Sequence, residues 1–129
     1  MKQEARLFRS LADETRLKIL WLLMAAEELC VCDIMHTLAI TQSKASRHLR
    51  YLFNLGWVTD RREGLWMYYR LAVPLDSPAG RQLAVLAEML GSRPEAQALR
   101  RRLSQRLEAK KRQRCQEADN KGFLASLQP

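Results

Sequence analysis

Apolar residues recur every three or four positions through most of the chain, which is the spacing of amphipathic helices. Asp13 is a suitable N-cap for the second of these segments, and Gly56 and Gly91 each follow a segment at a position typical of helix ends. The pattern predicts helices over residues 3–12, 14–24, 27–38, 43–55 and 79–90.

The segment 43–55 separates its residues onto two faces of a helix. One stripe is apolar and the other is polar and basic, with Arg47 and Arg50 at its centre. A short helix, a tight turn and a second helix of this kind form a helix-turn-helix. One face packs on the domain, and the other presents donors to guanine edges and phosphates in the major groove. The apolar stripe consists of Ala45, Leu49, Leu52 and Phe53, and the polar stripe of Ser43, Ser46, Arg47 and Arg50.

The period changes to two after Gly56. Residues 57–62 alternate, Glu63-Gly64 is predicted to be a two-residue turn, and residues 65–71 return as a second strand. Arg61 and Arg62 lie near the tip, so the hairpin is expected to be a wing over the DNA backbone. The predicted fold is therefore mainly α with a β-hairpin wing (α+β), a winged helix-turn-helix.

The composition favours a single domain with a polyanionic partner. The chain has 129 residues, with 22 Lys+Arg against 14 Asp+Glu and a net charge of +8. The positive charge is concentrated in residues 41–70 and 93–114, which favours binding to nucleic acid. No apolar run reaches the ~18 residues of a membrane span, and three cysteines do not suit a secreted disulfide scaffold. We therefore expect a cytoplasmic protein without a membrane partner.

The C-terminal quarter has a narrower apolar stripe, formed by Leu99, Leu103 and Leu107, on an Arg- and Lys-rich helix. Such a helix could extend a dimer interface, lie along DNA or fray in isolation. The sequence thus predicts a winged helix-turn-helix and dimerisation domain over 1–92. A basic helical extension is predicted over 93–119, and a flexible tail over 120–129.

Four segments taken in order, LADETRLKIL (11–20), ELCVCDI (28–34), TQSKASRHLRYL (41–52) and RREGLWMYYRL (61–71), resemble the arsenic-repressor (ArsR) family of bacterial winged-helix regulators. The resemblance covers roughly residues 5–90. It implies a homodimer, formed by the N-terminal helix and the helix after the wing, on an inverted repeat in double-stranded DNA. It also implies repression of an arsenic-resistance operon, relieved when As(III) or Sb(III) binds, with no permanently bound cofactor.

Residues expected to contact DNA follow from the basic stripe and from the family's recognition helix. Arg47 and Arg50 are the strongest candidates, since Arg reaches both phosphate and guanine. His48 either lies near DNA or packs beneath the contact. The predicted DNA-binding residues are Gln42, Ser43, Lys44, Ser46, Arg47, His48, Arg50, Arg61 and Arg62.

Cys30 and Cys32 are the candidate inducer ligands, because thiolates suit soft As(III), Sb(III), Cd(II) or Pb(II). Residues i and i+2 of a regular helix point in directions that differ by about 200°. They can grip one atom only if the helix is distorted or if they lie at its frayed start. Ligand binding should therefore disturb the helix that supports the recognition helix. The N-terminus of a helix would also lower the pKa of both thiols, whereas nearby carboxylates would raise it.

The family pattern has a third cysteine where this chain has Met35. A water or hydroxide could take the third position, or Cys115 of the same or the partner subunit. The alternatives to an arsenic response are a Cd(II)/Pb(II)-responsive repressor and a thiol-redox-responsive repressor of the same fold. Cys30 and Cys32 could also be two small buried hydrophobic residues.

An enzyme is not expected from this sequence. It contains no P-loop and no Gly-rich dinucleotide turn, and the CVC spacing differs from the CxxC of redox enzymes.

Overall fold

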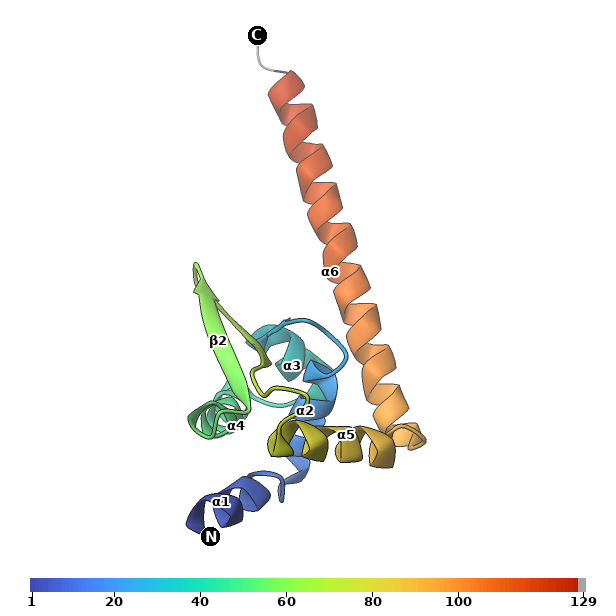
Figure 1. Cartoon of the computed structure of the whole chain (residues 1–129). Coiled ribbons are helices and arrows are strands. Elements are labelled where there is room, and N and C mark those ends of the chain that lie inside the picture. The colour runs from blue at the N-terminus through green and yellow to red at the C-terminus, as the bar shows by residue number, and fades with distance from the viewer. Residues whose placement is uncertain (128–129) are drawn as a thin grey trace.

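The computed structural model describes residues 1–127, which form six helices and a three-stranded sheet (Figure 1). In chain order the elements are α1 (Lys2–Ser10), α2 (Glu14–Leu23), β1 (Leu29–Cys30), α3 (Val31–Leu38), α4 (Gln42–Asn54), β2 (Val58–Glu63), β3 (Trp66–Leu71), α5 (Pro78–Leu90) and α6 (Pro94–Ser126).

Side-chain caps explain where three of the helices begin. The side chains of Asp13, Thr41 and Ser77 accept hydrogen bonds from backbone N–H groups in the first turns of α2, α4 and α5. The Asp13 bond, from the backbone nitrogen of Arg16, is 3.0 Å long. Each cap satisfies a donor that the helix itself leaves unpaired, which fixes the first turn.

The sheet has the order β1-β3-β2, and both pairs are antiparallel. β2 and β3 form the predicted hairpin, with Glu63 paired to Trp66 beside the turn. The turn itself is Gly64-Leu65, one residue later than the sequence predicted, and Gly64 has the positive φ of 60°. The hairpin and the α3–α4 pair confirm the winged helix-turn-helix fold.

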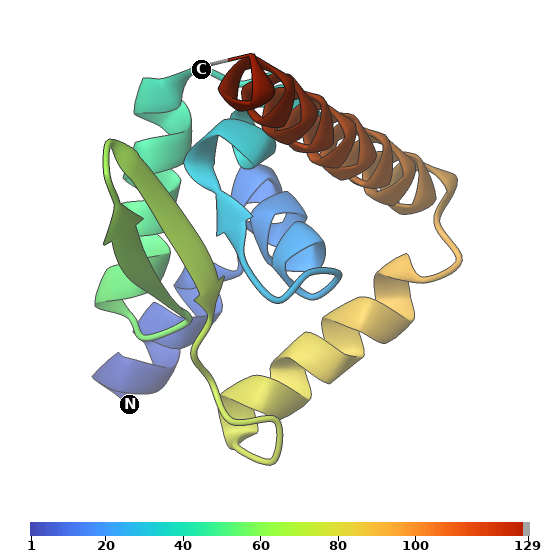
Figure 2. The same cartoon turned by 90° about the horizontal axis from the view of Figure 1, so that it is seen from above.

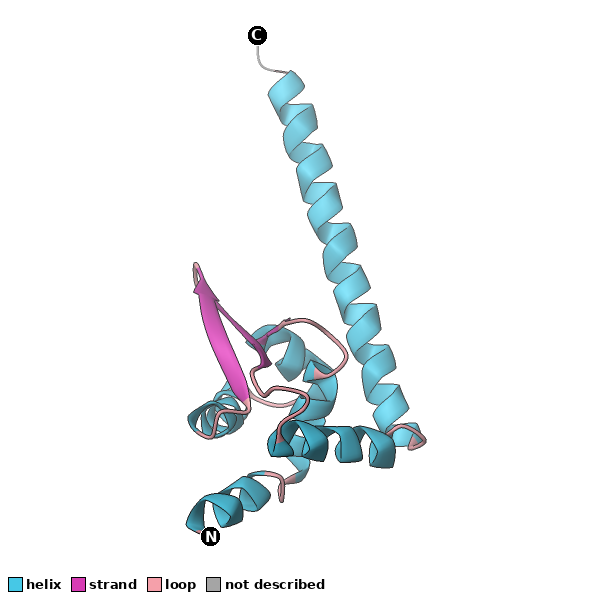
Figure 3. Ribbon diagram, viewed as in Figure 1, coloured by secondary structure: helices cyan, strands magenta, loops and turns pink. Residues whose placement is uncertain are grey.

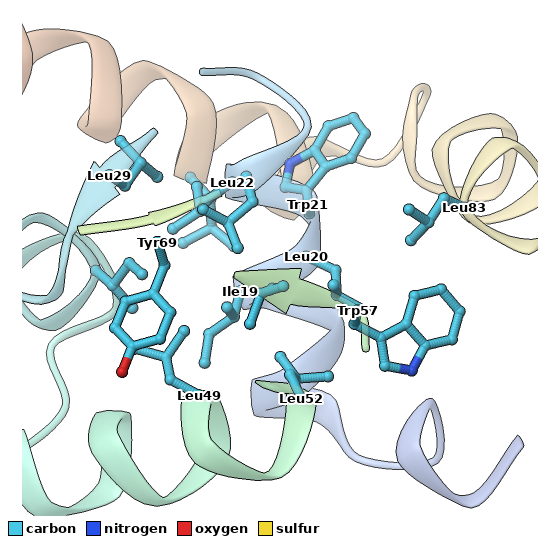
Figure 4. Packing of buried hydrophobic residues seen from close by; sticks show 14 of the residues in the cluster. Ile19, Leu20, Trp21, Leu22, Leu29, Leu49, Leu52, Trp57, Tyr69 and Leu83 are labelled. Carbon is cyan, nitrogen blue, oxygen red and sulfur yellow. The ribbon is translucent and has the colours of Figure 1, made fainter. Parts of the chain in front are cut away.

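α2 lies at the centre of the molecule, with α4 and the hairpin on one side and α5 and α6 on the other (Figure 2). Its residues Ile19 to Leu23 are all buried, because neighbours cover the helix on every side. Leu49 and Leu52 of α4 pack against this helix from one side, and Leu83 of α5 from another (Figure 4). The apolar stripe predicted for the recognition helix is thus its core face.

α6 packs only its N-terminal half on the domain and then extends well beyond the other elements (Figures 1 and 3). Leu99 and Leu103 are buried, whereas residues 111–127 are all exposed. The helix continues to Ser126, beyond the end near Asp119 that the sequence predicted. The last two residues of the predicted tail, 128–129, lie outside the described residues. Within residues 1–127, no helix combines the length and the apolar character needed to span a membrane.

Candidate functional site

The exposed face of α4 carries the predicted DNA-contact residues. Thr41 caps this helix through a 3.2 Å hydrogen bond from the backbone nitrogen of Lys44, and Ala45 and Leu49 face the core. The opposite face is free of contacts with the core and is rich in donors. It exposes Gln42, Ser43, Lys44, Ser46, Arg47 and Arg50.

His48 does not lie on this exposed face. Its side chain is buried, with Nδ1 3.3 Å from Nη1 of Arg16 and 3.9 Å from a carboxylate oxygen of Asp13. Burial lowers the pKa of His48, although the Asp13 carboxylate opposes that effect. Of the two roles that the sequence left open, this burial favours the packing role, and a contact of His48 with DNA stays a prediction.

A hollow of about 650 Å³ separates the recognition helix from the wing. Arg47 and Arg50 line it from α4, and Arg62 lines it from β2. With Asp60 as the acidic residue in the same lining, these three guanidinium groups leave the hollow net positive, which suits the phosphates of a duplex. Cys32 of α3 lines the same hollow, so a thiol and the basic surface are neighbours.

Arg61, the other predicted wing contact, is engaged within the chain. Its Nε donates to Glu28 at 2.9 Å, its Nη2 also reaches that carboxylate, and its Nη1 lies 3.1 Å from Glu63. The guanidinium also stacks over Tyr68, 4.6 Å from the ring centre. The hydrogen bond from Arg61 lowers the pKa of Glu28. Sequence reasoning missed this pairing, which ties the wing to the segment before the thiols.

The sequence predicted a helix over 27–38 with both cysteines inside it, but the two cysteines lie at the start of α3. Cys30 ends the short strand β1 and is the N-cap of α3, and Cys32 lies in the first turn. The backbone nitrogen of Cys32 donates to Sγ of Cys30 at 3.3 Å. Both thiols therefore lie where the helix begins, but this start is closed by a capping box and is not the frayed start that the sequence analysis considered.

The Cys30 thiol is held in its neutral form. Its side chain is buried, and this burial raises its pKa to about 11, with a smaller contribution from a hydrogen bond to Cys32. The sequence suggested a lowering effect from the helix N-terminus, but loss of water outweighs it. Cys32 is only partly buried, so it is the more accessible of the two thiols.

Asp33 is a site residue that the sequence analysis did not identify. Its Oδ2 accepts from the backbone nitrogen of Cys30 at 3.1 Å, and its Oδ1 accepts from Nε of Arg106 at 3.1 Å and Nζ of Lys110 at 2.8 Å. The side chain is 3% exposed. An acidic residue three positions after a helix N-cap is typical of a capping box, which is the signal that could have found it.

Cys115 lies on the exposed part of α6, beside Glu108, Arg112 and Asp119. Within residues 1–127 of one chain, no three His, Cys, Asp or Glu side chains are grouped closely enough to hold a metal ion. The structure thus brings Cys30 and Cys32 together without Cys115. A contribution from Cys115 of a partner subunit stays a prediction.

Comparison with known proteins matches the same segments. The family model described as "Bacterial regulatory protein, arsR family" covers residues 13–60. The chain is 51% identical over 67 residues to the arsenical resistance operon repressor of Escherichia coli, covering 52% of this chain and 57% of that protein. It is 45% identical over 67 residues to a CadC homologue from Staphylococcus aureus, named a cadmium resistance transcriptional regulatory protein, covering 52% and 55%. The matches span 50–61% of the first curated relatives' length.

A solved structure matches a larger share of the chain. It is the homodimeric winged helix-turn-helix DNA-binding domain of a possible ArsR-family transcriptional regulator from Mycobacterium bovis. The TM-score is 0.59 at 32% identity, and the match covers 72% of this chain and 82% of that one. All three similar proteins are described as regulators or repressors, which supports the prediction that the chain is not an enzyme.

Proposed function

Because the chain belongs to the arsR family of bacterial regulatory proteins, we propose that it represses an arsenic-resistance operon and leaves its operator when As(III) or Sb(III) binds. The observation that carries this proposal is the position of the thiol pair. Cys30 and Cys32 lie at the start of α3, and α3 packs directly on the recognition helix α4. A change at the thiols therefore acts on the element that supports the DNA-reading face.

The DNA-binding part of the proposal rests on the basic surface. The exposed side chains of α4 would enter the major groove, with Arg47 and Arg50 donating to bases or phosphates. Arg62 would contact the backbone from the wing. Arg61 would act indirectly, because its guanidinium is already paired with two carboxylates. The ligand would be an inverted repeat in double-stranded DNA, with half-sites about one helical turn apart.

A homodimer is proposed because a palindromic operator requires two recognition helices. The expected interface joins α1 and α5 of two copies. Both helices carry large apolar side chains in water, namely Phe8, Val85 and Met89 at 56%, 49% and 67% exposure. Burying them against a second copy would stabilise the pair.

The inducer would take its thiolates from Cys30 and Cys32. As(III) forms strong bonds to thiolates, and binding would release the protons of both thiols. Cys30 is buried and Cys32 only partly so, and therefore binding one atom from solvent through both sulfurs would draw Cys30 out of its buried position. The first turn of α3 would then change conformation. Cys115 of the partner subunit, or hydroxide, would complete the coordination.

Cd(II) or Pb(II) is the second candidate inducer. The similarity to the cadmium resistance regulator of Staphylococcus aureus favours it, and the same two thiolates would bind these soft cations.

The test is fluorescence anisotropy of the protein on duplex DNA from its own upstream region, titrated with arsenite under reducing conditions. Wild type is compared with Cys30→Ser/Cys32→Ser, and a Cys115→Ser variant shows whether the third thiol contributes to the response. We expect arsenite to release wild type but not the double variant. Release of the double variant, or failure of wild type to bind DNA, would overturn the proposal. Release by Cd(II) and not by arsenite would favour the second inducer.

A further inference from the structure

Four basic residues of α6 form hydrogen bonds with α2 or α3 of the domain. Nη2 of Arg100 donates to the backbone oxygen of Trp21 at 3.2 Å, and its guanidinium lies 3.2 Å from the Trp21 ring centre. Arg102 donates to the backbone oxygen of Thr37 at 3.1 Å. Further along the helix, Arg106 and Lys110 both reach the carboxylate of Asp33.

The Asp33 cluster, defined as Asp33, Arg106 and Lys110, connects this helix to the thiol pair. One oxygen of the buried carboxylate receives both cations, and the other receives the backbone N–H of Cys30. The same side chain thus holds α6 and caps the first turn of α3. Because a buried carboxylate without partners is costly, the two cations fix Asp33 where it holds Cys30 in place.

We propose that Asp33, Arg106 and Lys110 are positioning residues that keep the thiol pair in its ligand-free arrangement and so set the inducer concentration at which the repressor leaves DNA. This deepens the proposed function and rests on it. The cluster closes the first turn of α3 with Cys30 buried. α6 supplies the positive charge from two residues that lie 73 and 77 positions after Asp33 in the sequence.

Reciprocal coupling gives the direction of the effect. If inducer binding requires the first turn of α3 to open, it must weaken the contacts of Asp33 that hold this turn closed. By linkage, weakening those contacts in advance must strengthen inducer binding by the same factor. A protein without the two cations should therefore expose Cys30 more often and respond to less arsenite.

The experiment compares Arg106→Ala/Lys110→Ala with Arg101→Ala/Lys111→Ala in the full chain. The control removes the same charge from exposed positions of the same helix that form no ion pair within residues 1–127. Alkylation of Cys30 by neutral iodoacetamide is followed by peptide mass spectrometry, without DNA or arsenite. We expect the cluster variant to react about tenfold faster, the equivalent of about 1.4 kcal/mol, and the control to match wild type. Losing nearby positive charge would by itself slow a thiol reaction, so a faster rate reports opening of the turn.

A second measurement separates positioning from general damage. The arsenite concentration that releases half the DNA should fall about tenfold for the cluster variant, while its affinity for DNA without arsenite changes by less than about twofold. Arg106→Lys/Lys110→Arg, which keeps both charges, should behave as wild type. Asp33→Asn should resemble the cluster variant, and combining the two should add little, because both changes remove the same contacts.

The outcomes distinguish this inference from the proposed function. Alkylation needs neither DNA nor inducer, so an unchanged Cys30 rate in the cluster variant would overturn the role of the cluster even if arsenite releases wild type. Equal effects in the cluster and control variants would also overturn it, in favour of a general charge effect. A faster Cys30 rate with no arsenite response in wild type would leave the positioning of Cys30 standing and refute the arsenic sensor.

Discussion

Neighbouring wing residues Arg61 and Arg62 should contribute unequally to DNA binding. Arg62 lines the hollow shared with Arg47 and Arg50, where its charge adds to theirs. Arg61 is paired with Glu28 and Glu63, so its charge is already compensated within the chain. Each phosphate neutralised contributes about 0.9 to the slope of log binding constant against log salt. A dimer presents Arg62 twice, so Arg62→Ala should reduce the slope by up to about 1.8, and Arg61→Ala should leave it unchanged.

Anisotropy titrations over a series of salt concentrations give this slope for wild type and both variants. The matched pair removes one guanidinium from adjacent positions on β2, which controls for the loss of net charge. Arg61→Ala should instead lower the thermal stability only slightly, since exposed ion pairs contribute little. An Arg61→Ala slope that falls as far as that of Arg62→Ala would show that phosphates draw Arg61 away from its carboxylates. The reasoning from the static pairing would then be refuted.

Two stability measurements test the packing beneath the site at fixed protein concentration. Leu103→Ala should lower the free energy of unfolding in urea by about 2–5 kcal/mol, because the side chain is 2% exposed, whereas Leu124→Ala, at 61% exposure, should change it by less than about 0.5 kcal/mol. Equal losses would contradict the docking of α6. Burial lowers the pKa of His48, so the unfolded chain takes up that proton first, and stability should fall as the pH drops through about 6.5. His48→Gln should lessen this fall between about pH 7.5 and pH 5.5, and an unchanged fall would contradict the role assigned to burial.

The fold was predictable where one local pattern decides the structure. Ala45, Leu49 and Leu52 repeat at helical spacing and became the buried face of α4, and Gly64 has the positive φ the turn requires. The start of α3 was not predictable in the same way. Cys30 continues a helical pattern in sequence, but its backbone pairs with Tyr68 of the wing, a strand contact that only the tertiary structure supplies.

The recognition helix was likewise predicted with its exposed residues, whereas the partners of His48, Arg61 and Asp33 within the chain were not. The position of each of these three side chains depends on a partner that is distant in sequence. Asp33 contacts Arg106 and Lys110, which lie 73 and 77 positions away, and Arg61 contacts Glu28, 33 positions away. Periodicity shows which face of a helix is polar, but it does not show which charges on that face meet a partner.

The basic C-terminal block shows what this difference means for experiments. Counting charges over residues 93–114 favours a polyanion-binding helix, and deleting the block would be the natural test. Four cations of that block form hydrogen bonds with α2 and α3, namely Arg100, Arg102, Arg106 and Lys110. A deletion would therefore remove the partners of Asp33 and the residue that covers Trp21, together with any DNA contact. The change in the salt dependence of DNA binding would then combine these three effects. Five exposed cations of this block have no side-chain hydrogen bond to α2 or α3 within residues 1–127, so substituting them in place tests DNA binding without disturbing the thiol pair. They are Arg93, Arg101, Lys111, Arg112 and Arg114.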